Sequence, residues 1–161
     1  MKVVIQKVKR ASVTVDKQII SSIQKGLMLL VGISTEDTAE DVDKLSSKIL
    51  KLKLFEEQVA GSDDVPASFK AWSKSVVETK GEILSVSQFT LYANIKKGSK
   101  PDFHKAQKGH VAVELYNLFL QRLREGMQDE SSVKDGKFGA MMDVELVNDG
   151  PVTIVWDTRE K

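Results

Sequence analysis

The sequence predicts a single α+β domain that is rich in strands and contains two main helices. Its 161 residues, 41% hydrophobic and 29% charged, have the size and composition of one ordinary globular domain. Apolar residues alternate or run continuously in several short segments, as in strands. Two longer segments carry apolar residues at every third or fourth position, as in helices. No linker, internal repeat or low-complexity block is visible, so the domain is expected to span residues 1–161.

Strand signals dominate the first third of the chain. Val13 and Val15 lie in an alternating segment, and a hairpin turn is expected near Asp16-Lys17. The stretch from Gly26 to Ile33 is an almost continuous apolar run between glycines. Such a run predicts a central strand that is buried on both faces.

Two helices are expected from periodicity. Asp37 can cap the first one, with Glu40 three residues later in a capping-box-like arrangement. Its apolar face is formed by Val42, Leu45, Ile49 and Leu52. The second helix is expected to begin near Gly109-His110, with an apolar face of Ala112, Leu115, Phe119 and Leu123.

The remaining segments differ in how clearly they predict structure. Between Glu56 and Lys80 the pattern is weak, and the acidic turn-rich segment Gly61–Pro66 indicates a mobile surface excursion. Glu82–Leu91 is expected to form a strand. Two more strands are expected over Met141–Val147 and Val152–Trp156, separated by a turn at Asn148–Pro151.

Composition excludes several classes of function. Without cysteine there can be no disulfide framework, thiol nucleophile or thiolate metal site. The N-terminal residues resemble neither a signal nor a transit peptide, and no apolar run is long enough to span a membrane, so we expect a cytoplasmic protein without a membrane partner. A net charge of +1 excludes a globally basic nucleic-acid binder. Only the stretch from Asn94 to His110 is locally basic, through Lys96, Lys97, Lys100, Lys105 and Lys108 against one acid, Asp102.

Familiar catalytic constellations are absent. His104 and His110 are the only histidines, and their spacing does not supply a zinc site, so no metal is expected. A P-loop, a nucleophile elbow and a dinucleotide fingerprint are missing too, and no cofactor is expected.

Two short segments allow more than one interpretation. Ser87-Gln88-Phe89-Thr90-Leu91 brings two hydroxyls and an amide to the end of an apolar strand, where they can face solvent or line a pocket that orients a polar substrate. Gly150-Pro151 can be an ordinary trans turn or a cis bond that fixes its carbonyl groups. Composition does not choose between these alternatives.

Together, these two segments resemble the paired signature of the D-aminoacyl-tRNA deacylases: Ser-Gln-Phe-Thr-Leu, then Asn148-Asp149-Gly150-Pro151-Val152-Thr153. Further matches fall in the family order, so the resemblance spans nearly the whole chain. They are Ile5–Val8, Ala11–Val15, Gly26–Gly32, Trp72–Val76, Lys100–Phe103 and Gly136–Met142. The segment from Glu57 to Ser73 looks longer than in compact members of the family.

The resemblance implies a homodimer of a barrel-like α+β fold, with the 3′-terminal aminoacyl-adenosine of tRNA as substrate. It implies that Ser87, Gln88, Phe89 and Thr90 form the pocket floor, with Thr90 nearest the scissile ester. Gly150-Pro151, as a cis bond, would reach into the pocket of the other subunit. Phe138, Ala140 and Met142 would shape the amino-acid and adenosine pockets.

From these residues we expect a hydrolase that removes D-amino acids from tRNA and rejects L-amino acids. Thr90 has no base beside it in sequence, so we expect the ribose 2′-hydroxyl of the substrate to assist hydrolysis, with the backbone N–H groups of Phe89 and Thr90 supplying geometry. If the Gly150 and Pro151 carbonyls exclude an L side chain sterically, glycyl-tRNA should also be a substrate. The five lysines are expected to contact tRNA phosphates.

Two other classes remain open at this point. The main alternative is a nucleic-acid-binding module that keeps the fold without the reaction, as in relatives associated with animal replication origins. Those relatives have a C-terminal extension, which we do not expect after Lys161. A purely structural dimerisation domain would leave the hydroxyl-rich segment without a role.

Overall fold

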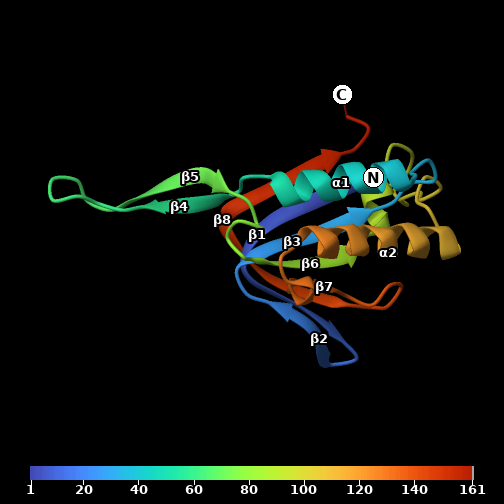
Figure 1. The fold of residues 1–161 in the computed structure, drawn as a ribbon. Helices are drawn as coiled ribbons and strands as arrows, with labels where there is room; N and C mark the ends of the chain where they lie inside the picture. The colour runs from blue at the N-terminus through green and yellow to red at the C-terminus, as the bar shows by residue number, and fades with distance from the viewer. Residues whose placement is uncertain (161) are drawn as a thin grey trace.

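In the computed structural model, which describes residues 1–160, a curved sheet is packed beneath two helices (Figure 1). The strands of the sheet follow the order β2-β1-β3-β6-β7, with β8 paired to β1. β3 and β6, and also β6 and β7, are parallel, while β1 is antiparallel to its neighbours. The strand bounds are β1 Lys2–Val15, β2 Gln18–Ile23, β3 Gly26–Gly32, β6 Glu82–Ser87, β7 Val133–Asp135 and β8 Asp143–Asp157.

The sheet curls until its two ends meet, which gives the expected barrel-like shape. Ser21 Oγ on β2 donates to the carbonyl oxygen of Asp135 on β7 at 2.5 Å. Lys134 Nζ donates to the carbonyl oxygen of Ser22 at 2.7 Å. These side-chain bonds span the gap between the terminal strands, so the barrel is nearly closed without a continuous backbone ladder. Inside it lies a small apolar core that includes Val13, Met28 and Val86.

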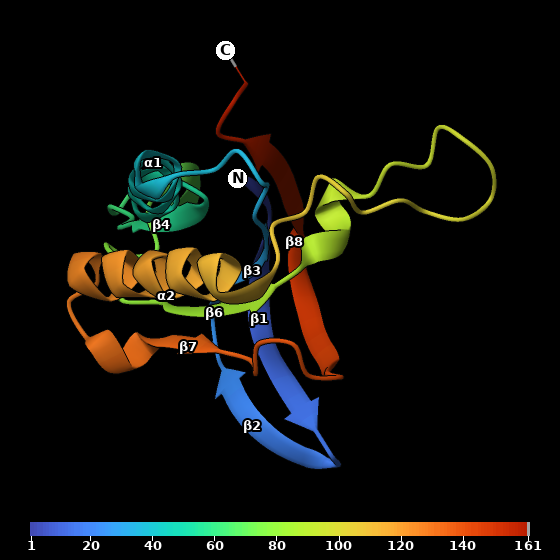
Figure 2. The same ribbon diagram turned by 90° about the vertical axis from the view of Figure 1, so that its right-hand side faces the viewer.

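Both helices, α1 (Ala39–Lys51) and α2 (Gly109–Gly126), cover one face of the sheet (Figures 1 and 2). The main core lies between them and β1, β3 and β6, with Phe55 and Phe119 among its largest fully buried side chains. The two predicted helices are therefore confirmed. On α2 the predicted face is extended by Tyr116 and Leu120, which are buried, whereas Leu115 is only partly buried.

The predicted cap of the first helix is wrong by one residue. The N-cap is Thr38, whose backbone N–H donates to Asp41 Oδ2 at 3.0 Å. Asp37 is buried instead and accepts from the Met1 amino group at 2.8 Å and from the Ser34 N–H at 2.7 Å. A buried carboxylate needs such partners, and here they tie the start of β1 to the loop after β3.

The C-terminal region also differs from the prediction, because β8 is one long strand and not two. Its pairing with β1 shifts from Val8–Asn148 to Gln6–Thr153, so the residues in between bulge out of the ladder. Asn148 closes this bulge: its Nδ2 donates to Thr153 Oγ1 at 2.7 Å, and its Oδ1 accepts from the Val152 N–H at 3.1 Å. The turn-like composition of Asn148–Pro151 therefore marks a bulge within a strand.

The weakly patterned segment forms a two-stranded arm, β4 (Phe55–Val59) and β5 (Ser68–Lys74), that projects from the body (Figure 1). The arm is mostly exposed, and Phe69 and Trp72 are 72% and 61% accessible. Sequence periodicity fails here because, beyond Phe55 at the base of the arm, no residue of β4 or β5 is buried. Among residues 1–160, no helix is both long and apolar enough to cross a membrane.

Candidate active site

A small apolar cavity of about 80 Å³ lies where β3 and β6 end, against the start of α2. It is lined by Val31, Ile33, Ser87, Gln88, Phe89, Gln107, Ala112, Phe138 and Gly139. Three of the four predicted floor residues, together with Phe138, are thus brought together. We call this cavity the acyl pocket, after the acyl group that the family resemblance implies. Its site at the carboxyl ends of parallel strands is a common position for ligands in sheets with helices on one face.

The floor of the acyl pocket is formed by a turn. The sequence predicted instead that the strand continues to Leu91. β6 ends at Ser87, and Phe89–Tyr92 form the 3-10 turn η1. The Gln88 N–H donates to the Val31 carbonyl at 2.7 Å, which is the last bond to β3 before the chain turns. η1 then crosses over Gly32. A Cβ atom at Gly32 would lie 3.0 Å from Leu91 Cβ and 3.1 Å from the Gln88 carbonyl oxygen, so glycine permits the close approach.

Thr90 lies on η1 but does not line the acyl pocket in this chain. Its hydroxyl is exposed and accepts a hydrogen bond from Gln88 Nε2 at 2.5 Å. Among residues 1–160, no imidazole or carboxylate is hydrogen-bonded to it. A threonine hydroxyl without a base is a weak nucleophile, so the geometry agrees with the doubt raised by the sequence.

Beneath the floor, Tyr116 supports β6, a role that sequence reasoning missed. Its hydroxyl donates to Ser85 Oγ at 3.0 Å, and both side chains are buried. Burial raises the pKa of Tyr116 well above its ordinary value, so the hydroxyl stays a neutral donor. The Tyr116 ring also lies 5.8 Å from that of Phe138, which links the support to the pocket wall. The sequence could have indicated this role, because Tyr116 lies one helical turn after Ala112 on the buried face of the predicted helix.

Ala140 and Met142 are not among the residues that line the acyl pocket of the single chain. Both are partly buried and pack against the core inside the barrel. Met142 Sδ also accepts from the Lys137 N–H at 3.4 Å, which orders the loop that presents Phe138 and Gly139. The role of these two residues in the amino-acid and adenosine pockets stays a prediction.

Gly150-Pro151 is a cis peptide bond in the bulge of β8. Both residues are exposed, and neither lines the acyl pocket of this chain. The Gly150-Pro151 bond, whose isomer composition left open, is therefore cis. The contact of this bond with a second subunit stays a prediction.

The basic stretch Asn94–His110 forms a loop that extends from η1 to α2 and away from the body (Figure 2). All five predicted lysines are exposed, and Asn94 and Asp102 pair through both backbone groups. The Phe103 ring meets the Phe89 ring edge to face, with centroids 5.0 Å apart. This contact places the root of the basic loop on the rim of the acyl pocket. Both histidines are exposed; a side-chain hydrogen bond from His104 lowers the pKa of Asp102.

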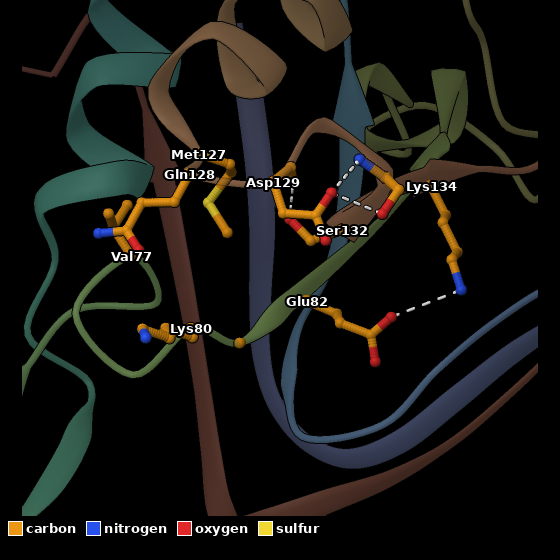
Figure 3. Close-up of a pocket in the computed structure, with 10 residues that line it drawn as sticks. Val77, Lys80, Glu82, Met127, Gln128, Asp129, Ser132 and Lys134 are labelled. Carbon is orange, nitrogen blue, oxygen red and sulfur yellow. Dashed lines mark hydrogen bonds and ion pairs between the residues drawn. The ribbon is translucent and has the colours of Figure 1, made fainter.

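A larger hollow lies elsewhere, at the opposite end of β6, and has a volume of about 570 Å³ (Figure 3). Several of its polar groups are paired with one another. Glu82 lies 3.4 Å from Lys134 Nζ, and Asp129 accepts from the N–H and hydroxyl groups of Ser131. The residues of the two sequence motifs gather at the smaller apolar cavity and not at this hollow. Within residues 1–160, no three potential ligands among His, Asp and Glu gather around a metal position.

Comparisons with known proteins identify the family of this chain. The family model described as D-Tyr-tRNA(Tyr) deacylase matches residues 4–157. A D-aminoacyl-tRNA deacylase of Saccharomyces cerevisiae is 56% identical over 160 residues, covering 99% of this chain and 100% of the yeast protein. One from Drosophila melanogaster is 52% identical, covering 100% of this chain and 94% of the fly protein.

Two solved structures have a similar fold. One titled c-Myc DNA Unwinding Element Binding Protein has a TM-score of 0.83 at 46% identity and covers 98% of both chains. Another, titled as a probable eukaryotic D-amino acid tRNA deacylase, has a TM-score of 0.77 at 18% identity, covers 96% of this chain and 97% of its own, and shows the shared fold. With the family model matched over almost its whole length, this chain belongs to the D-Tyr-tRNA(Tyr) deacylase family.

Proposed function

We propose that this protein hydrolyses the ester bond of D-aminoacyl-tRNA, releasing tRNA and the free D-amino acid, and that it rejects L-aminoacyl-tRNA. Full-length relatives at about half identity bear the name D-aminoacyl-tRNA deacylase. The observation that carries the proposal is the position of the acyl pocket, which adjoins the root of the exposed basic loop through Phe89 and Phe103. A charged tRNA presents a small acyl group beside a polyanion. The acyl pocket can receive the acyl group, and the basic loop can bind the polyanion.

The reaction uses positioning more than a protein nucleophile. An aminoacyl ester is already activated, so hydrolysis needs orientation and stabilisation of the developing oxyanion. Phe89 and Thr90 open the η1 turn, and the first N–H groups of such a turn have no acceptor within it. We assign oxyanion stabilisation to these two N–H groups. The substrate's 2′-hydroxyl activates water or assists the leaving group, since Thr90 has no base.

Chiral selection is assigned to Gly150 and Pro151 of a second copy of the chain. Both lie outside the acyl pocket of their own chain, on an exposed bulge of β8. In a homodimer that brings the bulge to the partner's pocket, their carbonyl groups occupy the space into which an L side chain would project. Glycine has no side chain to exclude, so glycyl-tRNA is also a substrate.

The basic loop holds the tRNA. Lys96, Lys97, Lys100, Lys105 and Lys108 contact phosphates, which gives affinity with little sequence information. No cofactor takes part. We infer a cytoplasmic reaction that serves chirality proofreading in translation.

Incubation with D-tyrosyl-tRNA and L-tyrosyl-tRNA tests the proposal directly. We expect rapid deacylation of the D-ester and none of the L-ester above the spontaneous rate. Binding of tRNA without deacylation of either ester would instead indicate a nucleic-acid-binding module. Glycyl-tRNA as inert as L-tyrosyl-tRNA would contradict steric exclusion as the source of selectivity.

A further inference from the structure

A second cavity, of about 250 Å³, lies beside the acyl pocket and, unlike that pocket, is lined by several charged side chains. Its walls include Lys2 at the start of β1, Tyr92 at the end of η1, Lys105 in the basic loop and Arg159 after β8. None of the roles assigned above uses this cavity as a binding site.

The two cavities are adjacent sites along one short backbone ladder. Ser34 and Ala106 form an isolated antiparallel bridge. On one side of this bridge, Gln107 N–H donates to the Ile33 carbonyl at 2.9 Å, and both residues line the acyl pocket. On the other side, Thr35 N–H donates to the Lys105 carbonyl at 3.0 Å, and both residues line the second cavity. Two residues along a strand span about 7 Å, so the cavities are that close.

The charge left over in the second cavity is positive. Three cations, Lys2, Lys105 and Arg159, face two carboxylates, Glu36 and Asp157. Arg159 Nε lies 3.9 Å from Glu36, whereas Asp157 accepts only from the backbone N–H of Arg159, at 3.0 Å. Lys2 and Lys105 form no ion pair with any carboxylate among residues 1–160. Lys2 Nζ lies 4.8 Å from the centre of the Tyr92 ring, which holds the ammonium group in place.

We propose that this second cavity binds a backbone phosphate of the tRNA 3′ end, namely the 5′-phosphate of the terminal adenosine. The ester to be cleaved and this phosphate are attached to opposite sides of one ribose. A substrate whose acyl group lies in the acyl pocket therefore presents the phosphate to the second cavity. Lys2 and Lys105 supply the positive charge, and the Tyr92 ring holds the Lys2 ammonium group at the wall of the cavity. The inference rests on the proposed function for the identity of the ligand.

Binding of adenosine 5′-monophosphate and of adenosine, each followed by NMR titration, separates the phosphate from the rest of the nucleoside. We expect wild-type protein to bind the monophosphate at least about tenfold more tightly, as charged hydrogen bonds would give. In the double variant Lys2→Gln/Lys105→Gln this preference disappears, while adenosine binding stays as in wild type. Unchanged adenosine binding also shows that the variant is folded.

Two further variants sharpen the test. Tyr92→Phe keeps the ring under Lys2 and removes only the buried hydroxyl, so we expect the preference for the monophosphate to stay as in wild type. Lys51→Gln removes an exposed charge at the far end of α1 and should also leave the preference intact. Equal affinity of wild-type protein for the two ligands, or a preference that survives in the double variant, would overturn the proposal. Deacylation of D-tyrosyl-tRNA by wild-type protein is measured alongside, so failure of the phosphate site and failure of the enzyme activity are told apart.

Discussion

Gly32→Ala should impair the reaction by moving the floor of the acyl pocket. The added Cβ would lie 3.0 Å from Leu91 Cβ, 3.1 Å from the Gln88 carbonyl oxygen and 3.2 Å from Tyr92 Cδ2. All three atoms belong to η1 or to the residue that precedes it. Because the Leu91 N–H is bonded to that same Gln88 carbonyl, at 3.3 Å, the turn must shift as a unit.

The size of the effect follows from these distances. Carbon atoms in contact are normally about 3.5–4.0 Å apart, so η1 must move outward by about 0.5 Å. A displacement of about 1 Å at a reacting centre can reduce the rate about 100-fold, so we expect kcat/KM to fall about tenfold. Overpacking of this kind also costs about 1–3 kcal/mol of stability.

Kinetics of D-tyrosyl-tRNA deacylation and urea denaturation measure the two effects separately. Gly126→Ala is the matched control, because its added Cβ would meet the flexible Leu50 side chain at 2.2 Å, at the end of α2 remote from the pocket. It should alter stability without changing kcat/KM. If Gly32→Ala has the wild-type kcat/KM, the placement of η1 does not control the chemistry.

Four further predictions follow from particular contacts. Tyr116→Phe should cost about 1–2 kcal/mol in urea denaturation because it leaves the buried Ser85 hydroxyl unpaired, and adding Ser85→Ala should cost less than the sum of the two single changes. Lys25, then Lys7, lower the pKa of Glu56 from 4.5 to about 2. The stability from this cluster is complete above pH 4.5 and is lost as pH falls towards 2, so Glu56→Gln should flatten the pH dependence of unfolding there; an unchanged slope would contradict it. Thr90→Ala should retain most deacylation, and a substrate ending in 2′-deoxyadenosine should lose it; the reverse pair of results would make Thr90 the nucleophile. Lys97→Glu should raise the Michaelis constant for several tRNAs alike and weaken its salt dependence, and an unaltered salt dependence would remove the loop from tRNA binding.

Elements with a buried face could be predicted from the sequence. β3 is buried along nearly its whole length, and α1 and α2 each bury one stripe, so hydrophobic periodicity reports them directly. The arm of β4 and β5 was missed because, beyond Phe55 at its base, none of its residues is buried and no pattern is imposed on them. The bulge in β8 was mistaken for a turn, because the same residue types satisfy both.

Some candidate site residues could be identified from sequence motifs, and others only from the tertiary structure. Ser87, Gln88, Phe89 and Phe138 meet in one pocket, as the sequence motifs indicated. Tyr116 carried no motif, and its importance depends on a hydrogen bond to a residue 31 positions away. Ala140 and Met142 fall beside the correct loop but face the barrel core, a choice made by packing and not by local sequence.

The sequence by itself determined the two helices, the central strand, the family resemblance and the identity of the polar groups at the end of β6, because each depends on residues close together in the chain. Only the tertiary structure decided where those groups point. The crossing of η1 over Gly32 and the bridge between Ser34 and Ala106 join segments that are distant in sequence. That bridge separates an apolar cavity from a basic one, and the division arises only when the two strands pair.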